Sequence, residues 1–148
     1  MKKKSKNLLS WGLKILAAAC GVAAFFVIFA DAVNYSALIF GDSFTGLQVA
    51  LGYTVNDIAV FKASAGIILA YLFPLVGACL LIIGESFKPA VVLAAAMMVT
   101  GGVLALCALS LLNGTYVGEP SLAAGAISSG ILSIVGGLAA CGSILIKA

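Results

Sequence analysis

Four long apolar segments constrain this chain more than any other feature of its sequence. They cover about residues 13–33, 63–83, 89–112 and 121–146, and none has a charged residue at its centre. A helix needs about 20 consecutive apolar residues to cross the hydrocarbon core of a bilayer. The sequence therefore predicts a single domain over residues 1–148, an all-α transmembrane four-helix bundle whose first partner is the lipid bilayer.

The overall composition supports this class and excludes most soluble functions. Of the 148 residues, 64% are hydrophobic and 9% are charged, whereas soluble domains have about 45–50% apolar and about 25% charged residues. The chain has no histidine, the usual general base and the commonest haem or metal ligand. It also shows no paired carboxylates, no nucleophile with a base and no glycine-rich phosphate loop. We expect no enzyme activity, cofactor, metal or nucleic-acid partner.

The four cysteines fall one in each apolar segment, at Cys20, Cys79, Cys107 and Cys141. A disulfide framework would place cysteines in extracellular segments, and a metal cluster would need convergent thiolates at a spacing such as Cys-x-x-Cys. We therefore interpret these residues as small packing residues buried between helices.

The distribution of lysines sets the expected orientation. If the amino terminus is cytoplasmic, seven of the eight lysines lie inside and only Lys62 lies outside. The positive-inside rule favours this arrangement, and Trp11 then lies at the inner interface. We expect a multi-pass plasma membrane protein with both termini in the cytoplasm. The alternatives for the first segment are a signal peptide cleaved after Ala32 and a lipid on Cys20.

The connection between the first two segments, about residues 34–56, has a different periodicity. Within FTGLQVALGYTV the larger apolar side chains alternate along the chain, at Leu47, Val49, Leu51 and Tyr53. The preceding GDSFTG has turn chemistry, so we predict a small β-hairpin here, between the first and second helices. Because unpaired amides are costly in hydrocarbon, the hairpin should be extracellular, with these four residues on an outer strand.

Two alternatives remain for the same stretch. Leu47, Ala50, Leu51 and Thr54 also fit one face of a short helix, although Gly46 and Gly52 argue against it. The GYTV end would also suit a re-entrant loop, although a channel of that kind needs a pore helix before it.

Small residues recur every four positions in two of the apolar segments. They are Gly125, Ser129, Ser133 and Gly137 in the fourth segment, and Gly66, Ala70 and Pro74 in the second. Such stripes let helix backbones approach closely, so they are the candidate helix-packing or oligomer interface. They either close the bundle of one chain or join two chains. Pro74 should kink its helix or release a carbonyl group for a neighbour.

The order of these elements resembles the tetraspan plan of claudins: helix, outer β segment, helix, tight inner turn, helix, short outer loop, helix. GLQ at residues 46–48 keeps two positions of the claudin motif Gly-Leu-Trp, but the outer segment has neither tryptophan nor a cysteine pair. TGLQVALGYT and LAYLFPLVG are also similar to segments of small four-span bacterial membrane proteins of an uncharacterised family. Neither resemblance implies an activity.

Two functions are compatible with this sequence. The first is a structural or interaction protein that self-associates into a homo-oligomer or assembles with a larger membrane partner. It is motivated by the small-residue stripes, the strand edge and the lack of a catalytic constellation. The alternative is a passive pore or small-solute carrier formed by the bundle or its oligomer. Its narrow lumen would be lined by uncharged residues such as Ser129 and Ser133.

Overall fold

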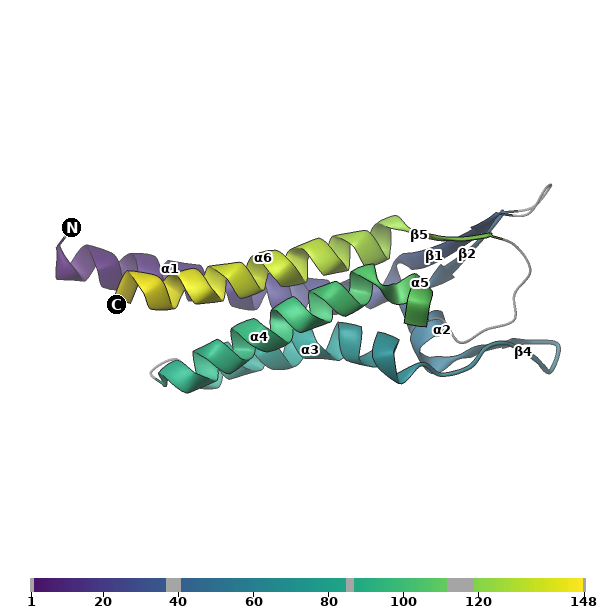
Figure 1. Ribbon diagram of the computed structural model, residues 1–148, viewed down its shortest axis with the longest axis horizontal. Coiled ribbons are helices and arrows are strands. Elements are labelled where there is room, and N and C mark those ends of the chain that lie inside the picture. Colours follow the sequence, from purple (N-terminus) through teal and green to yellow (C-terminus); the bar gives the residue numbers. More distant parts are fainter. Residues whose placement is uncertain (1, 37–40, 85–86, 112–118, 148) are drawn as a thin grey trace.

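Four long helices and a small unit of strands make up the protein (Figure 1). The computed structural model describes residues 2–36, 41–84, 87–111 and 119–147. Its elements are α1 (Lys3–Phe26), η1 (Val27–Phe29), β1 (Asp31–Ser36), β2 (Gly41–Thr45), α2 (Gly46–Leu51), β3 (Tyr53–Val55), β4 (Ile58–Phe61), α3 (Ala65–Ile83), α4 (Lys88–Leu106), α5 (Ala108–Leu111), β5 (Glu119–Leu122) and α6 (Ala124–Lys147).

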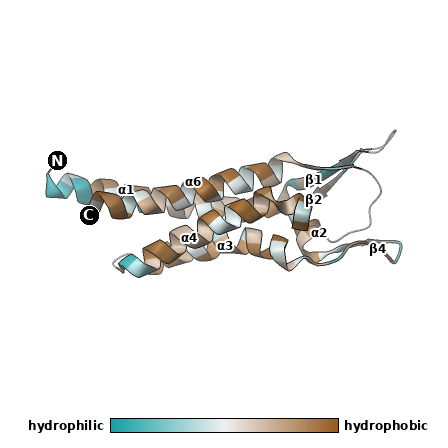
Figure 2. Cartoon of the chain, in the orientation of Figure 1, coloured by the Kyte–Doolittle hydropathy of each residue, from teal (hydrophilic) through white to brown (hydrophobic). Residues whose placement is uncertain are grey.

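The predicted four-helix bundle is confirmed. Helices α1, α3, α4 and α6 are each long and apolar enough to cross a membrane. α1 packs against α6 and α3, and α4 packs against the same two helices. The start of α1 and the end of α6 lie at one end of the bundle, together with the end of α3 and the start of α4, and the strands lie at the other end (Figure 1). Figure 2 shows that apolar residues cover most of the helix length, whereas the first turns of α1 are hydrophilic.

The helix ends differ from those expected from hydropathy. α1 begins at Lys3 instead of residue 13, because the polar residues before the apolar segment continue the same helix. It gives way to η1 and then to β1 at Asp31, before the predicted end at residue 33. α6 begins at Ala124 instead of residue 121, because the intervening residues pair with β1. α4 ends at Leu106; the predicted end at residue 112 lies outside the described residues.

A small antiparallel β structure is present between α1 and α3, as predicted, but its strands differ from those expected. β1 pairs with β2, with Tyr35 opposite Asp42. β2 therefore occupies the GDSFT stretch that the sequence assigned to the turn. β1 also pairs on its other edge with β5, which gives a three-stranded sheet of order β2-β1-β5. β5 contains Pro120, and an edge strand tolerates proline because one row of its backbone amides has no ladder partner.

The strand predicted over Leu47, Val49 and Leu51 is wrong, because these residues form helix α2; Tyr53 alone lies in a strand, β3. A capping box decides the conformation. The Gln48 amide donates to the Thr45 hydroxyl at 3.3 Å, and the Thr45 amide donates to the Gln48 side chain at 2.9 Å. These bonds satisfy two amides that a helix start leaves without partners. The short-helix alternative was correct for residues 46–51.

The second hairpin, β3–β4, turns through two residues with left-handed backbones. Asn56 and Asp57 have φ angles of 50° and 64°, and asparagine and aspartate are the residues other than glycine that adopt this region most readily. The turn sets Val55 opposite Ile58. We call the strands and α2 together the outer unit, because they lie at the end of the bundle away from the termini (Figure 1). It consists of a three-stranded sheet, a two-stranded sheet and α2, which lies between β2 and β3 in the chain.

Aromatic rings join the two sheets into one apolar core. Phe44 of β2 lies 4.8 Å from Phe61 of β4 and 5.9 Å from Tyr53 of β3, between ring centroids. Tyr35 of β1 lies 5.9 Å from both Phe44 and Phe61. The same cluster reaches Ile67 near the start of α3. This core fastens the outer unit to the bundle, and a two-stranded hairpin needs such support because it is marginal in water alone.

Candidate functional site

The small-residue stripe of α6 is used for packing within one chain. Ser129 and Ser133 are fully buried. The Ser129 hydroxyl donates to the Ala24 carbonyl of α1 at 3.0 Å, and the Ser133 hydroxyl donates to the Met98 carbonyl of α4. Both hydroxyls therefore bind neighbouring helix backbones. The lumen expected for the pore alternative stays a prediction.

The two glycines of the same stripe lie against backbone atoms. A Cβ at Gly125 would overlap the carbonyl of Asp31, where α6 passes the start of β1. A Cβ at Gly137 would lie 3.0 Å from the Ala95 carbonyl oxygen of α4. The same Cβ would also lie 2.5 Å from Val99 Cγ2. An added methyl group at either position therefore requires the neighbouring backbone to shift, which a close-packed interior resists.

The second stripe, on α3, faces both α1 and α4. Pro74 is fully buried. A Cβ added at Gly101 of α4 would lie 2.7 Å from the Pro74 ring, and a Cβ added at Gly21 of α1 would lie 2.6 Å from the Pro74 carbonyl oxygen. Ala70 is buried with its carbonyl facing Gly101, and Gly66 lies against Leu111 of α5. Gly21 was not identified as an interface residue from the sequence, because it belongs to neither stripe.

The cysteines differ from the expectation of burial. Cys20 is half-buried, but Cys79, Cys107 and Cys141 are exposed on the outer surfaces of the helices, and all four are free thiols. Three of them therefore face the surroundings of the bundle instead of its interior. The apolar character of a thiol suits a lipid-facing position as well as a buried one, which explains why the sequence could not separate the two.

The outer unit presents strand edges and exposed apolar side chains. Among the described residues, β4 pairs only with β3. Ile58 of β4 is 70% exposed, and Leu51 at the end of α2 is 61% exposed. A strand edge without protection can pair with another strand, so β4 is a candidate docking edge.

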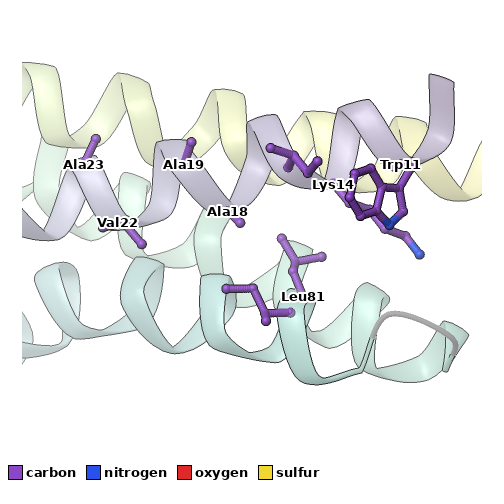
Figure 3. A pocket seen from close by; sticks show the side chains of 9 residues that line it. Trp11, Lys14, Ala18, Ala19, Val22, Ala23 and Leu81 are labelled. Carbon is purple, nitrogen blue, oxygen red and sulfur yellow. The ribbon is translucent and has the colours of Figure 1, made fainter. Parts of the chain in front are cut away.

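An apolar groove of about 630 Å³ lies between α1 and α3, towards the end that carries the termini (Figure 3). Trp11 and Lys14 lie at one end of the groove, while Ala23 lies at the other. Ile82 of α3 also lines it. The α1–α3 contact is the least extensive of the four neighbouring helix contacts in the bundle, which leaves room for the groove. The interfacial position of Trp11 was expected from the sequence and stays a prediction, whereas no sequence pattern indicated a groove.

The exposed basic residues are distributed unequally between the two ends. Lysines at the start of α1 and at the start of α4 are exposed at the end with the termini: Lys2, Lys3, Lys4, Lys6 and Lys88. Lys62 is exposed at the opposite end, in the outer unit, where Asp42 and Asp57 are also exposed.

In the same unit, burial raises the pKa of the Tyr35 phenol above its ordinary value, because the charged form loses solvation.

Within the described parts of the chain, no three histidine, cysteine or acidic residues lie close enough together to bind a metal ion. Comparison with protein-family models, with curated proteins and with solved structures returned no match. The fold and the surfaces described above are therefore the basis for any functional assignment.

Proposed function

We propose that this chain is an integral membrane interaction protein that assembles, with itself or with a larger membrane partner, through the β4 edge of its outer unit. The observation that carries the proposal is this edge, which ends in a strongly exposed Ile58 and has no strand beyond it among the described residues. Main-chain hydrogen bonds to an added strand would supply affinity, and the alternating side chains would supply specificity.

β5, one of the other edge strands of the outer unit, is less suited to this role. β5 has Pro120, which removes a backbone amide donor and so opposes pairing with a further strand. β4, Ile-Ala-Val-Phe, has no proline and no charge within the strand. Of these two strands, β4 is therefore the better candidate for edge pairing.

The charge distribution supports a cytoplasmic location for both termini and an extracytoplasmic location for the outer unit. The exposed lysines gather at the terminal end of the bundle, as the positive-inside rule requires of cytoplasmic segments. An open sheet edge cannot lie in hydrocarbon, where unpaired amides cost several kcal/mol each. The order of elements resembles the tetraspan plan of claudins, but the outer unit lacks the tryptophan and cysteine pair of claudins, so no claudin function is transferred.

The proposal can be tested by cysteine crosslinking in native membranes. In a background with the four native cysteines changed to alanine, Ala59→Cys places a thiol on the exposed part of β4, and Asn34→Cys places one on exposed β1. β1 is paired on both edges, so Asn34→Cys is the matched control. We expect a short reagent with one thiol-reactive end and one photoreactive end, which can bond to a partner of any composition, to trap a dimer or a larger adduct only at position 59.

Two results would contradict the proposal: a monomer alone at position 59, or equal adduct yields at positions 59 and 34. The orientation is tested in parallel with a membrane-impermeant thiol reagent on intact cells. Asp57→Cys, in the exposed β3–β4 turn, should react, whereas Ser5→Cys, exposed in the first turns of α1, should react only after the membrane is opened.

A further inference from the structure

The end of the bundle where α1 begins and α6 ends carries a cluster of exposed lysines. The first turns of α1 extend beyond the other helices at this end (Figure 1). Five exposed residues, at the start of α1 and the start of α4, form what we call the basic end: Lys2, Lys3, Lys4, Lys6 and Lys88. Within the described part of the chain, none of these five ammonium groups forms an ion pair.

The described acidic residues lie at the opposite end of the bundle, in the strands and turns of the outer unit. They are Asp31, Asp42, Asp57 and Glu119, while Glu85 lies outside the described residues. The residues described at the basic end therefore give it a positive surface, and such a surface attracts anionic groups from its surroundings.

The lysines of α1 lie at the depth of lipid headgroups. Tryptophan is typical of the boundary at which the headgroup layer begins. With Trp11 at that boundary, the helical rise places Lys6 about 8 Å and Lys3 about 12 Å farther along the helix axis. The headgroup layer is about 5–8 Å thick on each side of a bilayer, and charges act over about 8 Å at physiological ionic strength. Lys6 is therefore beside the headgroups, and Lys3 is within reach of their charge.

Exposed apolar side chains accompany the lysines. On α1, Leu8 is 73% exposed and Leu9 is 48% exposed, and Phe87, just before α4, is 65% exposed. Apolar residues interspersed with lysines are typical of the membrane interface, where the apolar side chains enter the acyl boundary and the ammonium groups reach the headgroups. An acidic protein would offer charge alone, whereas a bilayer matches both kinds of side chain.

We propose that the basic end binds the headgroups of anionic phospholipids, with Lys4 and Lys6 on α1 and Lys88 on α4 as the main contacts. Charge complementarity supports this partner, and so does continuity with the lipid-facing surface of the four membrane-spanning helices. A cluster of four to eight lysines next to a membrane span is typical of such binding. The interaction requires the bundle to span a bilayer, but it requires neither the β4 edge nor a particular orientation.

Trp11 makes the lipids at the basic end observable, because it is the only tryptophan in the chain and is 52% exposed. The full chain is reconstituted in vesicles of equal amounts of phosphatidylcholine and phosphatidylglycerol, and one of the two lipids is brominated to quench Trp11 fluorescence. We expect phosphatidylglycerol to be preferred beside Trp11 at least about fivefold, the factor that one lysine near the surface supplies. The preference should fall towards unity at about 1 M salt, where charges act over only about 3 Å.

Matched variants test which lysines carry the preference. Lys6→Gln should lower it, whereas Lys62→Gln, which removes the same charge from the exposed surface of the outer unit, should leave it unchanged. Changing all five residues of the basic end to glutamine should bring it to near unity, and changing them to arginine should retain it. Because all five side chains are exposed, these variants should keep the wild-type helix content, which circular dichroism checks.

Equal quenching by the two lipids in the wild-type protein would overturn the proposal. So would a preference that persists at about 1 M salt or in the five-glutamine variant, or an equal loss in Lys6→Gln and Lys62→Gln. If the lipids quenched equally but polyglutamate bound the wild-type protein in detergent more tightly than the five-glutamine variant, the partner would be an acidic protein instead. Crosslinking at the β4 edge is measured separately, so failure there would leave these results unchanged.

Discussion

Replacing Gly21 with alanine should loosen the bundle where α1 crosses α3. A Cβ at this position would lie 2.6 Å from the Pro74 carbonyl oxygen and 3.0 Å from both the Ala78 Cβ and the Met98 Cε. The carbonyl belongs to the α3 backbone and cannot rotate away. It would have to retreat by about 0.8 Å to reach the 3.4 Å at which ordinary contact begins, so the two helices must separate.

Gly12→Ala provides the matched control on the same helix. A Cβ at Gly12 would meet nothing within 4 Å, so this variant changes only the intrinsic helix preference, which favours alanine by up to about 1 kcal/mol. Because both glycines lie within α1, that preference largely cancels between the two variants. The remaining difference is the cost of overpacking, about 1–3 kcal/mol. We expect Gly21→Ala to be less stable than Gly12→Ala by this amount.

The free energies of unfolding can be measured by titrating folded protein in mild detergent with sodium dodecyl sulfate and following helix loss. Gly12→Ala should unfold at the wild-type denaturant fraction or slightly above it, and Gly21→Ala should unfold clearly below Gly12→Ala. Equal midpoints for the two variants, or a higher midpoint for Gly21→Ala, would refute the close approach of the α1 backbone to Pro74.

Two further predictions concern single polar groups. Ser129→Ala removes the hydroxyl bonded to the Ala24 carbonyl and should cost about 0.6 kcal/mol in the same titration, the average for such bonds in a membrane bundle. Burial raises the pKa of Tyr35 above 10.0, so the tyrosinate absorbance that is absent from Tyr35→Phe should have its midpoint above pH 10.0. The contribution of the neutral Tyr35 phenol to folding stability should be complete below about pH 10 and should be lost as the pH rises through the raised pKa.

The long helices could be predicted from the sequence because hydropathy over about 20 residues depends on composition alone. The local structure of residues 46–51 could have been predicted from a signal of a different kind. Thr45-x-x-Gln48 has the spacing of a capping box, which outweighs five or six residues of apolar alternation. Likewise, Asn56-Asp57 between Tyr-Thr-Val and Ile-Ala-Val-Phe has the residue types of a two-residue hairpin turn.

Other features depend on contacts between distant residues and could not be predicted locally. β5 pairs with β1 across more than 80 residues of chain, with Ser121 opposite Asn34, and neither strand carries a pattern that specifies the other. The partners of the stripe residues could not be predicted locally either, because a small residue permits close approach of any backbone. Their positions therefore indicated contact but not whether Ser133 would face α4, α1 or another chain.

The use of the stripes within one chain limits where assembly can occur. Self-association through Ser129 or Gly137 would have to break contacts with α1 or α4, whereas Ile58 is already exposed. Bundle stability and assembly should therefore respond to different substitutions. Gly137→Ala should lower the free energy of unfolding and leave crosslinking at Ala59→Cys unchanged in the protein that remains folded.

Ile58→Lys should have the opposite effects. The side chain at position 58 is 70% exposed, so stability should change by no more than about 0.5 kcal/mol. A lysine on an edge strand opposes pairing with a second strand, so the adduct at Ala59→Cys should disappear. If Ile58→Lys left the adduct intact while Gly137→Ala removed it, the helix stripes and not the β4 edge would join the partners.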